Sequence, residues 1–185
     1  VHGLKSWNLL TSSDLVHWQD KGLNLLPDQP FDAQGVYSGS ALPIGEKLFI
    51  TYNGNVRDDQ WVRHPKQNGA WLQADESVTK LAQPLIDDVP EGYTDHFRDP
   101  QIIEHEGYYY LFLGAQRIDK TGHIVAYRAQ QVTGPWTFLG EVDMGSTPWG
   151  YMIECPNLVF IDHRPVILFC PQGIAQADLP LPNLY

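Results

Sequence analysis

The stretch that decides the fold is RDPQIIEHEGYYYLFLG, residues 98–114. It consists of a short first segment, a tight turn at residues 104–107 and a strongly apolar second segment. Two such segments joined by a glycine-containing turn are typical of a β-hairpin. The same plan occurs as SGSALPIGEKLFITYNG at residues 38–54 and as ECPNLVFIDHRPVILFC at residues 154–170. The chain therefore carries an internal repeat, and each unit begins with a hairpin.

The length of the repeat predicts the architecture. Gly54 and Gly114, which close the apolar segments of two hairpins, are 60 residues apart. Two further stretches, residues 11–18 and 127–136, read as an outer strand followed by a turn that places a tryptophan, and residues 71–81 read as a degenerate third copy. A unit of nearly 60 residues with about four short strands is typical of a propeller blade, whose first strand lies innermost. We therefore predict an all-β fold with about three blades of a β-propeller.

Composition and charge narrow the class of protein further. The chain has 185 residues, enough for one domain, and 43% of them are hydrophobic, which argues against disorder. Acidic residues outnumber basic ones by 22 to 12, so we expect neither nucleic acid nor an anionic membrane as a partner. No stretch is long and apolar enough to span a membrane. The histidines and cysteines show no metal-ligand spacing, so we expect no metal site.

The two cysteines both lie in the third hairpin. Cys155 and Cys170 stand on either side of the turn at residues 162–164, so they could face each other across the hairpin. A disulfide and a pair of free thiols are both compatible with this position. We expect two free, partly buried thiols.

Two acidic side chains occupy matching places in successive repeats. Asp99, preceded by Arg98, and Glu154 both stand at the start of an innermost strand, and such positions converge on one mouth of a propeller. Two carboxyl groups flanking a pocket suit glycoside hydrolysis. A nearby arginine keeps one of them ionised, while burial raises the pKa of the other. The weakly polar neighbours of Glu154 predict that it is the one in apolar surroundings; the alternative is structural, with Asp99 capping a turn and pairing with Arg98.

These motifs resemble those of a known family. Phe97-Arg98-Asp99-Pro100 and Glu154-Cys155-Pro156, in that order, are similar to two of the three signature motifs of glycoside hydrolase family 32. Residues 37–41 resemble the aromatic-Ser-Gly-Ser segment of that family, and residues 12–18 resemble the end of its first blade. Residues 53–57 and 113–117 look like those of its bacterial sucrose-6-phosphate hydrolases and invertases in particular. The resemblance covers essentially the whole chain.

The resemblance implies a fold and a set of roles. The family fold is a five-bladed β-propeller followed by a β-sandwich, so residues 1–185 would be a partial catalytic propeller domain without the sandwich. Glu154 would be the general acid/base, and Asp99 would stabilise the transition state by binding fructose hydroxyls. Arg98 would anchor the sugar, and Tyr37 and Ser38 would line the fructose pocket. No cofactor and no metal would be needed.

Two departures from the family pattern matter. The nucleophile motif, Asn-Asp-Pro-Asn-Gly, is absent from residues 1–185, and it would lie upstream of Val1. The usual Trp-Gly is replaced by His2-Gly3, which removes an aromatic sugar contact. We therefore expect the 185-residue chain by itself to be an inactive fragment.

The implied activity is retaining cleavage of the β-fructofuranosyl bond of sucrose or sucrose 6-phosphate. The motifs leave open a fructan hydrolase, a fructosyltransferase of the same fold, and a propeller that binds sugar without catalysis. The expected partner in every case is a small carbohydrate. The bacterial relatives imply a cytoplasmic protein; a secreted one is the alternative, because residues 1–8 show neither a signal peptide nor a natural N-terminus.

Overall fold

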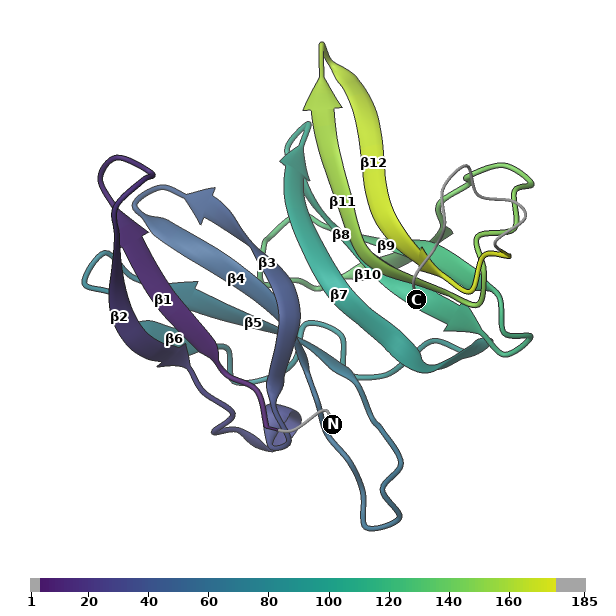
Figure 1. The fold of residues 1–185 in the computed structure, drawn as a ribbon, viewed down its shortest axis with the longest axis horizontal. Helices are drawn as coiled ribbons and strands as arrows, with labels where there is room; N and C mark the ends of the chain where they lie inside the picture. The colour runs from purple at the N-terminus through teal and green to yellow at the C-terminus, as the bar shows by residue number, and fades with distance from the viewer. Residues whose placement is uncertain (1–3, 176–185) are drawn as a thin grey trace.

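The computed structural model describes residues 4–175, and the predicted all-β class is confirmed (Figure 1). Within these residues lie twelve strands and one short 3-10 turn, Pro30–Asp32. The strands are β1 Trp7–Ser12, β2 Trp18–Leu25, β3 Val36–Ile44, β4 Lys47–Gly54, β5 Lys66–Leu72, β6 Val78–Lys80, β7 Tyr93–His105, β8 Tyr108–Arg117, β9 Gly122–Ala129, β10 Thr137–Glu141, β11 Met152–Ile161 and β12 Arg164–Gln172. None of the described residues forms a helix long and apolar enough to cross a membrane.

The strands form four antiparallel sheets, each built from strands that follow one another in the chain. Two sheets have four strands, in the orders β3-β4-β5-β6 and β7-β8-β9-β10, and two have two strands, β1-β2 and β11-β12. The three predicted hairpins are β3/β4, β7/β8 and β11/β12, and each turn falls where the sequence placed it. This is the arrangement expected of blades, whereas the number of blades in a closed ring stays a prediction.

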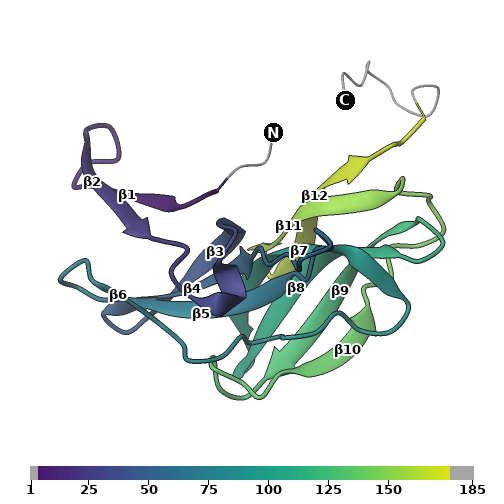
Figure 2. The same ribbon diagram turned by 90° about the horizontal axis from the view of Figure 1, so that it is seen from below.

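The first strands of the three sheets that contain the predicted hairpins, β3, β7 and β11, lie next to one another. Strand β7 contacts β3 on one side and β11 on the other. Figure 2 shows β3, β7 and β11 near the middle of the molecule, with β6 and β10 away from them. The first strand of each of these three sheets is therefore its innermost strand, as the repeat predicted.

Side chains, rather than backbone ladders, join these inner strands. Ser40 Oγ on β3 donates to Pro100 O at 3.1 Å and accepts from Ile102 N at 2.9 Å, both on β7. Gln101 on β7 makes the equivalent pair of bonds to Leu158 on β11, donating from Nε2 to its carbonyl at 3.1 Å and accepting from its amide at 2.5 Å. Neighbouring sheets are thereby fixed in register while remaining separate ladders.

Each inner strand has an irregularity at the same place. The pairing register shifts between Val36 and Gly39 in β3, between Arg98 and Gln101 in β7, and between Glu154 and Asn157 in β11. Asp99 has φ 61° and Cys155 has φ 49° within these shifts. A bulge bends a strand and redirects its side chains. All three inner strands therefore turn at the end that carries the candidate site residues.

The bulge in β11 corrects the expectation for the cysteines. Cys170 pairs across the hairpin with Glu154, because Cys155 is looped out of the ladder. Both thiols are free, as expected, but both residues are exposed and not partly buried. The sequence pattern assumed an unbroken ladder, in which Cys155 and Cys170 would have been opposite each other.

The main core lies between the two four-stranded sheets. It is built by alternating apolar residues of β4, β7, β8 and β9, with Phe49, Phe97, Leu111 and Leu113 fully buried among others. Trp71 packs edge-on against Phe49 with ring centroids 4.8 Å apart. Gly114 lets β8 approach β11, because a Cβ there would lie 1.9 Å from Ile153 O. Close packing at that point determines where the following residue, Glu154, stands.

Candidate active site

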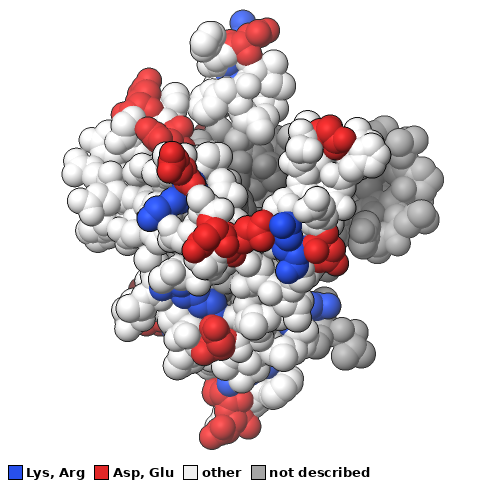
Figure 3. All heavy atoms as spheres, turned by 90° about the vertical axis from the view of Figure 1, so that its left-hand side faces the viewer, with Lys and Arg blue, Asp and Glu red and all other residues white. Residues whose placement is uncertain are grey.

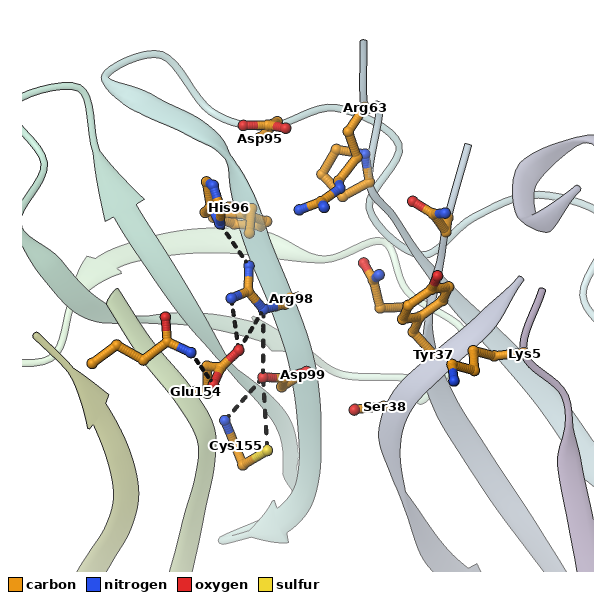
Figure 4. A pocket seen from close by; sticks show the side chains of 15 residues that line it. Lys5, Tyr37, Ser38, Arg63, Asp95, His96, Arg98, Asp99, Glu154 and Cys155 are labelled. Carbon is orange, nitrogen blue, oxygen red and sulfur yellow. Dashed lines mark hydrogen bonds and ion pairs between the residues drawn. The ribbon is translucent and has the colours of Figure 1, made fainter. Parts of the chain in front are cut away.

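The bulged ends of β3, β7 and β11 surround a pocket of about 580 Å³. All five residues singled out from the sequence line it: Tyr37, Ser38, Arg98, Asp99 and Glu154. Figure 4 shows Arg98, Asp99 and Glu154 on one wall and Tyr37 and Ser38 on the opposite wall. The repeat register thus correctly predicted that side chains far apart in the chain would converge here.

Arg98 holds the two carboxylates in one cluster. Its Nη2 lies 2.7 Å and its Nε 3.2 Å from Glu154 Oε1. The same Nε lies 4.0 Å from Asp99 Oδ2. The two carboxylate oxygens therefore cannot be farther apart than these two distances together, which is within the span of glycosidase carboxyl pairs, up to roughly 9.5 Å. The close partner of Arg98 is Glu154, not Asp99 as in the structural alternative.

Asp99 is the buried member of the pair. Its residue is 7% exposed, and its Oδ2 accepts the backbone N–H of Cys155 at 3.0 Å. Burial raises the pKa of Asp99, while the Cys155 amide and the charge of Arg98 act in the opposite direction. A carboxylate held by a backbone donor on the next strand is fixed in orientation, and it is suited to gripping a ligand hydroxyl.

Glu154 has different surroundings from those that its sequence neighbours predicted. Its side chain is 31% exposed, its Oε1 is paired with Arg98, and its Oε2 accepts a hydrogen bond from Gln172 Nε2 on β12. Successive side chains of a strand point to opposite faces, so the adjacent residue Ile153 faces away from Glu154 and chain neighbours do not define its environment. Strands β7 and β12 do, and both present polar groups to it.

Several lining residues were missed by sequence reasoning. His96 Nδ1 lies 2.9 Å from Arg98 Nη1, and burial, followed by the charge of Arg98, lowers the pKa of His96. The imidazole is therefore neutral at neutral pH and accepts from the arginine. Further lining residues come from loops and strand ends outside the repeat register: Lys5, Asn53, Arg63, Asp95 and Gln172. The position of Gln172 opposite Met152 could have been read from the third hairpin, but that of Arg63 carries no repeat signal.

Two further expectations concern metal ligands and the replacement of the family's Trp-Gly. In the described part of the chain, no group of three or more His, Cys, Asp and Glu side chains is placed to hold a metal ion. His2 and Gly3, which replace the usual Trp-Gly of the family, lie outside the described residues.

Comparison with known proteins gives a consistent result. The model of the glycosyl hydrolases family 32 N-terminal domain matches residues 1–185. A sucrose-6-phosphate hydrolase of Pediococcus pentosaceus is 50% identical over 185 residues, which is all of this chain and 37% of that protein. The chain therefore spans just over a third of the length of such relatives.

Solved structures agree in fold and in family. The structure of a sucrose-6-phosphate hydrolase from Lactobacillus gasseri has a TM-score of 0.90 and 46% identity, covering 96% of this chain and 36% of that chain. A variant of the Bombyx mori GH32 β-fructofuranosidase in complex with sucrose has a TM-score of 0.74 and 29% identity, covering 92% of this chain and 36% of that chain. With its motifs, its inner-strand site and a family match over every residue, the chain belongs to glycosyl hydrolase family 32, as part of the N-terminal domain of that family.

Proposed function

We propose that the full-length protein is a retaining β-fructosidase that cleaves sucrose or sucrose 6-phosphate, and that residues 1–185 form part of its catalytic propeller. The observation that carries the proposal is the placement of Asp99 and Glu154 on either side of Arg98 in one pocket. The activities that the names of its relatives state, sucrose-6-phosphate hydrolase and β-fructofuranosidase, give the same reaction class.

In this proposal Glu154 is the general acid and then the general base. A carboxylate outside residues 1–185 attacks the anomeric carbon of fructose, while Glu154 protonates the departing glucosyl oxygen. Water then attacks the fructosyl–enzyme bond, and Glu154 accepts its proton. The partly exposed position of Glu154 supports the role, because its carboxyl must meet both the leaving oxygen and water.

Asp99, Arg98, Tyr37 and Ser38 form the sugar-binding part of the proposal. Asp99 is oriented by the Cys155 amide and accepts hydrogen bonds from fructose hydroxyls, which strengthen as positive charge develops on the ring. Arg98 holds both carboxylates and keeps the pair in register. Tyr37 and Ser38 close the opposite wall, so that fructose lies between β3 and β7.

The direct test uses the full-length protein with sucrose and sucrose 6-phosphate and measures fructose release. Glu154→Gln keeps the shape of the side chain but cannot transfer a proton, so kcat should fall by roughly 10²-fold or more. Glu104→Gln, at the exposed far end of β7, is the matched control and should leave kcat unchanged. Full activity of Glu154→Gln would exclude the assigned role.

The same assay separates the alternatives. A fructosyltransferase would release glucose in excess of free fructose, and a fructan hydrolase would prefer fructo-oligosaccharides to sucrose. A sugar-binding propeller would bind sucrose in calorimetry without releasing any product.

A further inference from the structure

The loop at residues 55–65, between β4 and β5, carries a pair of arginines that face each other. Arg57 and Arg63 form an isolated antiparallel bridge across this loop, which projects from the rest of the molecule in Figure 1. Like charges directly opposite each other in a strand pair are destabilising. An anion bound near the two guanidinium groups would offset this repulsion.

The two arginines differ in what they contact. Arg57 donates from Nη1 to Trp61 O at 2.8 Å and lies over the Trp61 ring, 5.3 Å from its centroid. Arg63 lines the pocket and extends into it in Figure 4. Among residues 4–175, no carboxylate oxygen lies within the 4.0 Å ion-pair distance of Arg63. Arg63 is thus a pocket cation without a carboxylate partner.

Besides Arg98, the cations that line the pocket are Lys5, which is exposed, and Arg63, which is partly buried. Arg98 is engaged by Glu154 at 2.7 Å, so it is not available for an anionic substrate group. Arg63 is about half-buried, and burial lowers its pKa while Asp95 offsets only part of that effect. An arginine nevertheless stays protonated, so an anionic substrate group would complement its charge.

We propose, on the basis of the function proposed above, that Arg63, backed by the facing Arg57, binds the phosphoryl group of a phosphorylated disaccharide. Sucrose 6-phosphate rather than sucrose is then the preferred substrate. The planar guanidinium donates two parallel N–H groups to two phosphoryl oxygens, a geometry that the point charge of a lysine does not offer. The phosphoryl group stays on the leaving sugar, so the chemistry at Glu154 and Asp99 is unchanged.

The negative charge of residues 1–185 makes a local cationic site useful for an anionic substrate. The net charge is −10, and acidic side chains are scattered over the face shown in Figure 3. A negative field slows the approach of a dianionic substrate. Arg63 in the pocket and Arg57 in the adjoining loop attract it locally, and their effect weakens with salt over a screening length of about 8 Å at physiological ionic strength.

The test compares two substrates in the full-length protein. Arg63→Ala should lower kcat/KM for sucrose 6-phosphate by about 10- to 100-fold, chiefly through KM, because charge-assisted hydrogen bonds are lost. It should lower kcat/KM for sucrose by less than about 3-fold, since sucrose lacks the anion. Arg63→Lys should recover part of the loss. Arg164→Ala removes an exposed arginine at the far end of β12 and should leave both substrates unaffected.

Inhibition by inorganic phosphate tests whether Arg63 binds a free phosphate anion. It should inhibit sucrose hydrolysis competitively in the unmodified protein and much more weakly in Arg63→Ala. Activity on sucrose also reports that the variant is folded. Equal losses on the two substrates, or equal inhibition by phosphate, would overturn the assignment of Arg63. If the unmodified protein released fructose from neither substrate, the proposed function itself would fall.

Discussion

Arg98 serves two carboxylates at once, and the two differ in what else surrounds them. Asp99 is buried and accepts a backbone N–H, whereas Glu154 is partly exposed and accepts from Gln172. This difference supports the proposal that the fixed carboxylate binds fructose and the accessible one transfers the proton. Both assignments can be separated experimentally at the level of single residues.

An activated fructoside, whose leaving group departs without a proton, isolates the acid role of Glu154. Glu154→Gln should retain far more of its fructosylation rate on this substrate than on sucrose, because no proton donor is needed for the first step. The measurement is the pre-steady-state burst of leaving group from the full-length protein. Equal losses on the two substrates would show that Glu154 is not the acid.

Asp99→Asn should raise the stability of the fold and lower the rate of fructose release. Burial raises the pKa of Asp99 above 3.8, so its ionised form destabilises the fold at neutral pH. This cost is fully present above the folded-state pKa and disappears as the pH falls below the unfolded value. Asparagine removes the charge and tolerates φ 61°. We expect about 1 kcal/mol of added stability at pH 7, or a Tm higher by about 2–4 °C.

The control for this prediction is Asp162→Asn. Asp162 also has a positive φ, 48°, but it is exposed in the turn between β11 and β12. It therefore reports the conformational preference of asparagine without the effect of burial. The gain at Asp99 should exceed the gain at Asp162 at pH 7 and vanish in acid, while fructose release by Asp99→Asn falls with a raised KM. A pH-independent gain would contradict the account.

Hairpins are the elements that the sequence predicted best. Apolar alternation and turn residues located β3/β4, β7/β8 and β11/β12, because these signals are local. The shared bulges were not predicted, since a bulge depends on the fit between neighbouring strands and leaves no local composition signal. The error over Cys155 and Cys170, and the mistaken surroundings of Glu154, both come from this missing information. Arg63 was missed because its loop lies outside the repeat.

The contact of β8 with β11 gives a prediction at the level of elements. Gly114→Ala places a Cβ 1.9 Å from Ile153 O, so β11 must move and carry Glu154 with it. We expect a loss of about 1–3 kcal/mol in the free energy of unfolding and reduced kcat. Gly69→Ala is the matched control, because its Cβ would meet only the ends of side chains such as Leu81 and Phe49 at 2.8 Å. Denaturant midpoints measure the stability of the two variants, and fructose release measures their kcat.

Apolar side chains are exposed on the two outer sheets, β1-β2 and β11-β12, and they affect the association of the whole molecule. Leu23 on β2 is 67% exposed, and Leu168 on β12 is 58% exposed. Trp18 on β2 is 54% exposed, and β1 and β2 form a sheet of only two strands among the described residues. Large exposed apolar side chains beside unpaired strand edges favour association.

Residues 1–185 expressed alone should therefore self-associate and release no fructose from sucrose. Size-exclusion chromatography with light scattering is the measurement, with the full-length protein as the control. A stable monomer of about 21.0 kDa would contradict the first expectation. Fructose release at a rate near that of the full-length protein would contradict the second, which rests on the absence of the nucleophile motif.

The order of the strands within each sheet also determines when the pocket can form during synthesis. Among residues 4–175, strands β3 to β6 pair with one another, as do β7 to β10, so each sheet can fold as soon as it has left the ribosome. The pair of Arg98 and Glu154 joins residues 56 positions apart in different sheets. Such contacts form slowly, because the intervening chain must be ordered first. We therefore expect the individual sheets to form first and the pocket that they share to assemble after them.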